Sequence, residues 1–203
     1  MITSLFCLAG FASGEEADYP RIPVAAVERY AASTISEVIE SMNVPLTLMR
    51  SSSLVFKMDP IDNHIAVEPP AGVSARLTHY ANPALKVDLI SFKKANFGHN
   101  LSEATLNAYL LGRAQDFTEE QAFKILNEPA FTTGPARFRF FGVRSVPLSY
   151  SFLEKDVQLT REENWFDIDG YIHIISVEAP SRFFISYFES IRVPFNSSTP
   201  VGN

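Results

Sequence analysis

Arginine and phenylalanine alternate in one short segment, residues 135–144, which reads PARFRFFGVR. Successive side chains of an extended strand point to opposite faces, so Phe138 and Phe140 share one face. The opposite face carries Arg137, Arg139 and Phe141. Basic and aromatic side chains on one strand are the types that could stack nucleic-acid bases or hold phosphates.

Nucleic-acid binding is nevertheless not what this segment predicts. A strand of the RNA-recognition type carries a glycine before its aromatic residues and lies in a basic domain. Here Gly142 follows the aromatic residues, and the formal net charge of the chain is −6, which repels polyanions. We therefore interpret the segment as one strand of a sheet. What remains is a candidate surface for a protein partner or a small anion, formed by Arg137, Arg139, Phe141 and Arg144.

Other residues that could do chemistry show no pattern of a known site. No two of the four histidines have the spacing of a zinc-ligand pair, and His173 alternates with isoleucines, which predicts a satisfied or surface histidine. The acidic pair Glu162 and Glu163 is interpreted as solvated charge. The chain lacks the glycine-rich phosphate loops and the common hydrolase and zinc-protease motifs. We assign no catalytic residue, no cofactor and no metal ligand.

The first residues are similar to a secretory signal peptide. An uncharged apolar run from Ile2 to Ala12 is followed by small residues and then by two glutamates, although the usual basic start is missing. Cleavage after about Gly14 would remove Cys7, the single cysteine. The alternative is a buried N-terminal helix or strand. We expect an exported protein, which is periplasmic, lumenal or secreted, and no stretch approaches the ~20 apolar residues of a membrane-spanning helix.

The composition, with 46% hydrophobic and 12% aromatic residues among 203, is that of a folded domain with a single core. Helical spacing predicts an amphipathic helix over residues 23–42. Asn100 with Glu103 and Thr118 with Gln121 form capping-box patterns, which predict two helices, the second ending before Pro129. A closing helix is expected at 181–193.

Alternation and turn residues predict the strands. The expected ranges are 45–49, 53–58, 64–68, 74–80, 85–93, 136–146, 148–155, 163–168 and 170–178. The strand at 85–93 is expected to be buried on one face, and Asp169 with Gly170 predicts a tight hairpin.

The predicted fold class is α+β, a central antiparallel sheet flanked by helices, with the added N-terminal helix. The expected organisation is a signal peptide (1–14), an N-terminal helix with a connecting segment (15–52), an α+β sandwich domain (53–195) and a flexible tail (196–203). The order of elements, with YIHIISVEAPSRF leading into the closing FESIRV helix, resembles the PsbP-like α/β/α sandwich family over roughly residues 53–193. That resemblance implies binding and assembly roles and carries over no catalytic residue.

The sequence thus favours an exported, non-enzymatic domain that recognises a protein partner or a small ligand. The alternative is a hydrolase-like or lipid-handling enzyme whose site residues are dispersed along the chain. A pocket that joins a histidine to a carboxylate and to a serine or threonine nucleophile would favour the enzyme. An apolar groove or an exposed patch of phenylalanine would favour the binding domain.

Overall fold

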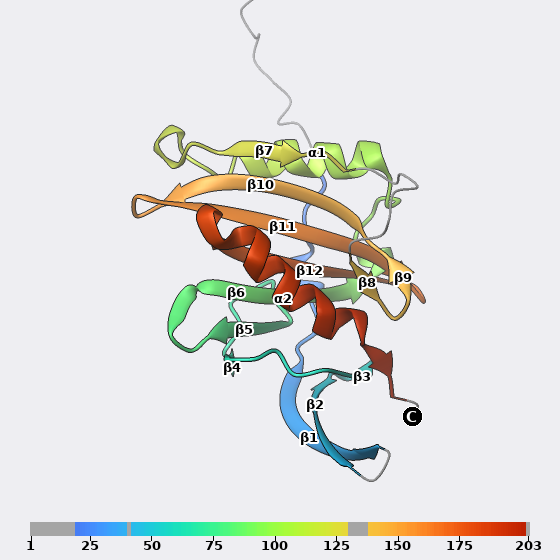
Figure 1. Ribbon diagram of the computed structural model, residues 1–203. Coiled ribbons are helices and arrows are strands. Elements are labelled where there is room, and N and C mark those ends of the chain that lie inside the picture. Colours follow the sequence, from blue (N-terminus) through green and yellow to red (C-terminus); the bar gives the residue numbers. More distant parts are fainter. Residues whose placement is uncertain (1–18, 40–41, 130–137, 202–203) are drawn as a thin grey trace, which may run out of the picture.

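A seven-stranded antiparallel sheet forms the centre of the protein in the computed structural model, which describes residues 19–39, 42–129 and 138–201 (Figure 1). Each neighbouring pair of strands is antiparallel. In spatial order the strands are β4 (His64–Val67), β5 (Ala75–His79), β6 (Asn82–Lys93), β12 (Tyr171–Pro180), β11 (Val157–Ile168), β10 (Val146–Glu154) and β7 (Lys124–Asn127).

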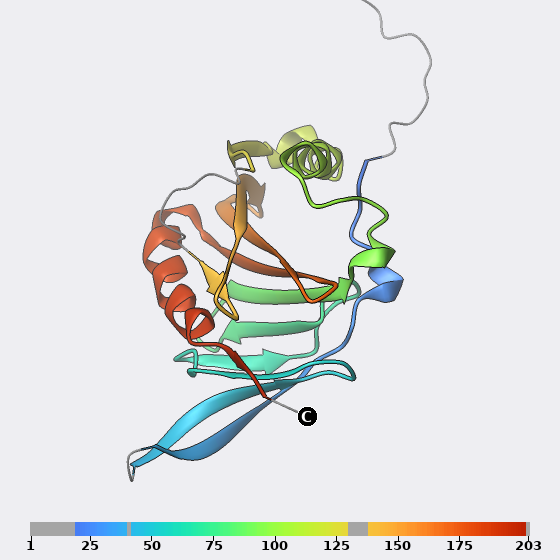
Figure 2. The same cartoon turned by 90° about the vertical axis from the view of Figure 1, so that its right-hand side faces the viewer.

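One long helix lies on each face of this sheet, so the domain has three layers (Figure 2). Helix α2 (Phe184–Asn196) packs over Val87, Leu89 and Ile175, whereas α1 (Glu103–Ala114) packs over the opposite face, which includes Ile90 and Phe92. Strand β6 is therefore buried on both faces over its C-terminal half, and the expectation of a half-buried strand is wrong there. Both helices were predicted from the sequence.

A second, four-stranded sheet lies beside the first and contains β1 (Ala31–Ile39), β2 (Met42–Arg50), β3 (Val55–Met58) and β13 (Thr199–Pro200). Strands β1 and β2 form a ribbon that projects from the body of the domain (Figure 2). Residues 196–201, assigned to a flexible tail in the sequence, form the end of α2 and the strand β13, which pairs with β3.

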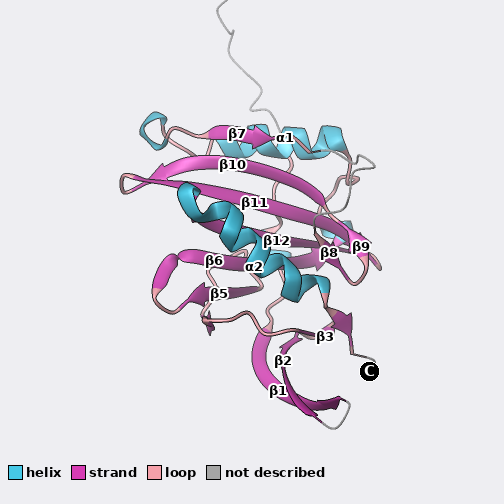
Figure 3. Ribbon diagram, viewed as in Figure 1, coloured by secondary structure: helices cyan, strands magenta, loops and turns pink. Residues whose placement is uncertain are grey.

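The N-terminal helix predicted over 23–42 is wrong. Only Val24–Ala26 forms a short 3-10 turn, η1, and β1 occupies most of the remainder (Figure 3). Residues four apart, such as Ala31 and Ile35, share one face of a helix but also one face of a strand, so their spacing does not separate the two. The β-branched residues in this stretch favour the strand.

Two further predictions are corrected. The second helix, expected after Thr118, is the short 3-10 turn η3 (Glu119–Gln121), which ends because Ala122 adopts a left-handed conformation with φ 46°. The following residues form β7. The single strand expected at 136–146 is a hairpin of β8 (Arg139–Phe140) and β9 (Val143–Arg144), after which β10 begins. Short 3-10 turns η2 (Lys94–Asn96) and η4 (Ser181–Phe183) complete the described elements.

The sequence predicted the turns more accurately than the residue that caps helix α1. Asp169 and Gly170 both have positive φ and connect β11 to β12, as expected for a two-residue hairpin turn. Thr118 and Gln121 do form a capping box. Helix α1, however, is capped by the Ser102 side chain, which accepts a hydrogen bond from the Thr105 N–H at 3.1 Å, and not by Asn100. No helix in the described part of the chain has the length and apolar character needed to cross a membrane.

The cap of α1 can be tested by substitution. We expect Ser102→Ala to lower the free energy of unfolding by about 1 kcal/mol, because the backbone N–H at the third helical position loses its acceptor. Asn100→Ala is the matched control and should change stability little. Urea denaturation of the three proteins measures both effects, and an equal loss in both variants would contradict the assignment of the cap.

Candidate functional site

The arginine and phenylalanine segment that the sequence singled out belongs to the β8–β9 hairpin. Phe138 and Phe140 are completely buried in the core under α2. Arg139 and Arg144 are exposed and stand opposite each other as a cross-strand pair. Arg137 lies outside the described residues. The structure thus places two of the three predicted arginines together on one hairpin, and the partner or anion surface stays a prediction.

Phe141, the fourth predicted residue, faces inward from the turn of this hairpin. It adopts a left-handed conformation with φ 51° and is followed by Gly142 with φ 76°. A left-handed conformation is strained for a bulky residue and costs on the order of 1–2 kcal/mol. The ring of Phe141 stacks on that of Phe140, with 4.0 Å between the centroids, and this packing helps to offset the strain.

Phe141 lines a cavity of about 670 Å³ on the α2 side of the sheet, which we call the His173 cavity. Its walls come from the β8–β9 turn, the β11–β12 hairpin, β13 and the residues before β3. Apolar side chains on these walls alternate with hydroxyls, one carboxylate and one imidazole. The apolar walls include Leu54, Phe141, Val143, Ile168 and Pro200, and the polar groups include Asp169, Tyr171, His173 and Ser198.

His173 is only 2% exposed, and its Nδ1 lies 2.8 Å from the Ser91 hydroxyl oxygen, within hydrogen-bond distance. The ring is stacked beside Tyr171 and meets the edge of Phe140. Burial lowers the pKa of His173 from 6.5 to about 4, and the charge of Glu28 offsets this only in part. The imidazole is therefore neutral at neutral pH. His173 is a satisfied, buried histidine, which is one of the two states that the sequence predicted.

The pairing of His173 with Ser91 does not make a usable nucleophile. Ser91 is completely buried and does not line the cavity, so a substrate there could not reach its hydroxyl. Within the described ranges no carboxylate accepts a hydrogen bond from His173, whereas in serine hydrolases a carboxylate accepts from the base and orients it. Nor do three potential metal ligands gather anywhere among the described residues. The geometry suits binding better than acyl transfer.

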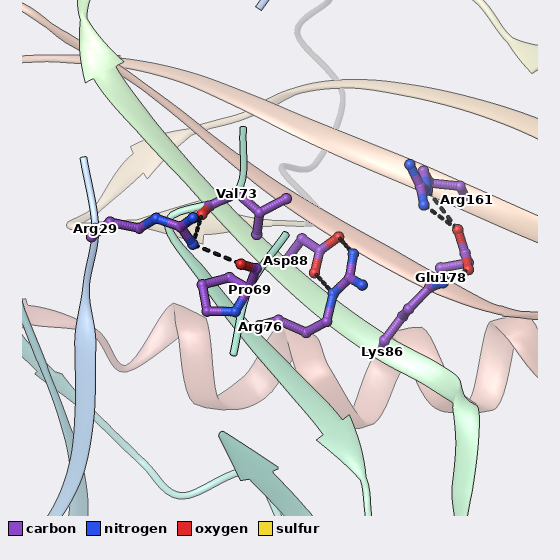
Figure 4. Close-up of polar contacts among 8 residues, drawn as sticks. All are labelled: Arg29, Pro69, Val73, Arg76, Lys86, Asp88, Arg161 and Glu178. Carbon is purple, nitrogen blue, oxygen red and sulfur yellow. Dashed lines mark hydrogen bonds and ion pairs between the residues drawn. The ribbon is translucent and has the colours of Figure 1, made fainter. Parts of the chain in front are cut away.

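The opposite face of the sheet carries ionic side chains where α1 does not cover it. Two neighbouring cross-strand rows run over β5, β6, β12, β11 and β10. The first row is Thr78, Lys86, Glu178, Arg161 and Tyr150, and the second is Arg76, Asp88, Ser176, Glu163 and Leu148. We call the six ionic members of these rows the charged ladder, and Figure 4 shows two of its pairs on the side of the sheet that faces away from α2.

Each carboxylate of the charged ladder is held by several donors. Arg76 binds Asp88 through two hydrogen bonds, of 2.6 and 2.7 Å. Glu178, 2% exposed, accepts two hydrogen bonds from Arg161 and lies 2.6 Å from the Lys86 Nζ. Burial raises the pKa of the Glu178 carboxyl, but Arg161 and Lys86 together hold it below its ordinary value of 4.5. Glu178 is therefore ionised at neutral pH.

Glu163 is the acceptor of the ladder that is surrounded by neutral donors. The Tyr150 hydroxyl donates to it at 2.8 Å, the Tyr109 hydroxyl at 3.4 Å and the Trp165 indole N–H at 3.2 Å. Burial, followed by the charge of Glu163, raises the pKa of Tyr150 to about 12, so this hydroxyl keeps its proton and donates. The interpretation of Glu162 and Glu163 as solvated charges is wrong, because both are buried in β11.

Part of the charged ladder lines a second cavity of about 490 Å³, which we call the arginine cavity. It lies between the sheet, α1, the N-terminal segment and the loop that contains Gly72. Arg29 of the N-terminal segment fixes this loop, because it donates to the carbonyl oxygens of Pro69 at 2.8 Å and Val73 at 3.2 Å (Figure 4). Sequence reasoning missed this site. The alternation of Lys86 and Asp88 with apolar residues was the available signal, but it is also typical of a solvated strand face.

Two solved structures are similar to this fold. The solution structure of cyanobacterial PsbP (CyanoP) from Synechocystis sp. PCC 6803 matches with a TM-score of 0.50 at 10% identity, covering 72% of this chain and 86% of that chain. The crystal structure of LpqN, involved in cell envelope biogenesis of Mycobacterium tuberculosis, gives 0.47 at 9% identity, covering 85% and 92%. No family model matches the chain, and no curated protein matches it. The fold is PsbP-like, as the order of elements predicted.

The neutral state of His173 has a measurable consequence for stability. Between pH 6.5 and about 4, the unfolded chain binds a proton at this histidine and the folded protein does not. Stability therefore falls as the pH falls through this window, by up to about 3 kcal/mol. We expect His173→Gln to remove this contribution. Urea denaturation at several pH values measures it, with His99→Gln at an exposed position as the control. Parallel pH profiles for the wild type and His173→Gln would contradict the assignment.

Proposed function

We propose that this protein is an exported, non-enzymatic domain that binds a small, largely apolar ligand in the His173 cavity. The observation that carries the proposal is the cavity itself. Its volume of about 670 Å³ lies within the range of small-molecule sites, which are mostly apolar and contain a few convergent polar groups. A neutral imidazole, hydroxyl groups and the Asp169 carboxylate supply that polar part and suit a hydrogen-bond donor on the ligand.

Two features of the cavity wall support a binding role. Phe141 holds a strained backbone conformation at the wall, and strain of this kind occurs preferentially at functional sites. The wall is also built from segments that lie far apart in the sequence, from Leu54 to Pro200, so its shape depends on the complete fold. The hydrolase alternative has weaker support. His173, Asp169 and Ser198 all line the cavity. His173, however, is hydrogen-bonded to the inaccessible Ser91, and Ser198 accepts from the Phe141 N–H.

Export is part of the proposal and rests on the sequence. The apolar run followed by small residues at 1–14 supports a cleaved signal, and these residues lie outside the described part of the chain. A protein partner, the second kind of target that the sequence favoured, is also proposed only on that basis.

Native mass spectrometry of the protein purified from its own host, starting near Glu15 and without stringent washing, tests ligand binding. We expect a retained small-molecule mass. A bare monomer that also takes up no Nile red, a neutral apolar probe, would contradict the proposal and leave partner binding as the working hypothesis.

A substitution that fills the cavity locates the site. Val143 lines the cavity and is 37% exposed, so Val143→Trp should occupy its space and reduce ligand retention and Nile red fluorescence about tenfold or more. Val157, 44% exposed at the start of β11, does not line it, and Val157→Trp is the matched control. Equal binding by both variants would show that the ligand lies elsewhere.

A further inference from the structure

The arginine cavity concentrates positive charge in an acidic protein. Four arginines from four separate segments line it, namely Arg21, Arg76, Arg113 and Arg161. Three carboxylates line it as well, those of Asp88, Asp116 and Glu163. The formal charge of the lining is therefore four minus three, or +1, in a chain whose net charge is −6. The cavity is therefore more favourable to an anion than the surface of the protein as a whole.

All three carboxylates of the cavity are already engaged through both oxygens. Asp88 accepts from Arg76 at both of its oxygens. Asp116 accepts from Arg21 at one oxygen and from Arg113 at the other. Glu163 accepts the two tyrosine hydroxyls at Oε1 and the indole N–H at Oε2. The lining therefore offers little free acceptor capacity to a ligand.

The arginines, by contrast, keep unused donors. Each guanidinium has five N–H groups, and Arg21 uses only Nη1 in the hydrogen bonds found here. The Arg113 Nε is buried and has no hydrogen-bond partner among the described residues. A buried N–H without an acceptor is costly and rare in folded proteins. An oxygen atom of a bound ligand would satisfy this donor.

We propose that the arginine cavity binds a small oxyanion, a molecule that carries a carboxylate or phosphate group. Guanidinium groups bind both kinds of oxyanion through paired hydrogen bonds. A neutral apolar ligand would instead leave the spare donors buried without partners. The site is open to entry, because the Arg113 side chain is 24% exposed and that of Arg76 23% exposed. This site is independent of the His173 cavity, since the two lie on opposite faces of the sheet.

Structural ion pairing alone does not account for this arrangement. Arg76 and Arg161 have partners of their own in Asp88 and Glu178, and such pairs are weak evidence for a gain in stability. Arg21 and Arg113, however, share the single carboxylate of Asp116. The third lining carboxylate, Glu163, is hydrogen-bonded to two tyrosines and a tryptophan and to no arginine, so the lining keeps a formal excess of +1 that an anion complements.

Isothermal titration calorimetry at low salt, with sodium citrate and inorganic phosphate as probes, tests the proposal. We expect saturable binding by the wild-type protein and about tenfold or greater weakening in Arg113→Gln, because a charged hydrogen bond is lost. Arg192→Gln is the matched control. Arg192 pairs with Glu189 three residues away on α2, as Arg113 pairs with Asp116, but it does not line the cavity.

A second variant and a second source of anion complete the design. Arg21→Gln, at a more exposed position, should also weaken binding, and it keeps the test decisive if Arg113→Gln unfolds. Vesicles of phosphatidylglycerol, compared with phosphatidylcholine alone, distinguish a lipid headgroup from a free anion. Binding to vesicles only, lost in either variant, would identify the headgroup as the source. No binding of any probe, or binding that both variants retain in full, would overturn the proposal. Val143→Trp should leave anion binding unchanged.

Discussion

Two helices cannot cover both faces of a seven-stranded sheet, and this constraint shapes the rest of the molecule. Strands lie about 4.8 Å apart, so seven of them span on the order of 30 Å, whereas a helix with its side chains is about 10 Å wide. Each face carries one long helix of the described chain. Most of the sheet must therefore be covered by other segments or carry side chains that tolerate water.

The two faces meet this constraint in different ways. On the α2 face, the second sheet and the β8–β9 hairpin complete the cover, and their phenylalanines join the same core. The β8–β9 hairpin does not pack completely against the β11–β12 end of the sheet, and the His173 cavity lies between them. On the α1 face, the cover is the N-terminal segment and one loop. There the sheet carries the charged ladder, whose charges are ion-paired or, at Glu163, hydrogen-bonded to neutral donors, because an isolated buried charge would cost several kcal/mol.

Much of the fold was predictable because its signals are local. The alternation of apolar and polar residues predicted the positions of most strands. The dipeptide Asp169-Gly170 predicted a hairpin, because the type of a turn depends on the residues within it. The error at β1 was also local, because Ala31 and Ile35 fit a helix and a strand equally well. The two cavities were harder to predict, because residues from separate segments of the chain line each of them. Glu178 meets Arg161 across the β11–β12 hairpin, but it meets Lys86 only through the pairing of β12 with β6, which is distant in sequence. The sequence predicts a solvated Glu163, because no residue close to it in the chain indicates that Tyr109 and Tyr150 will surround its carboxylate.

The central strand β12 connects the two cavities and indicates what kind of function the fold can support. His173 points to one face and Ser176 and Glu178 to the other, so both sites rest on a single rigid strand with neighbours on each side. Ser91, His173 and Glu163 are buried and hydrogen-bonded to other protein groups, and of the three only His173 and Glu163 line one of the two cavities. One cavity thus presents apolar walls with a few polar groups and the other presents arginine donors, so the two proposed sites would differ in the shape and charge of the ligands they accept.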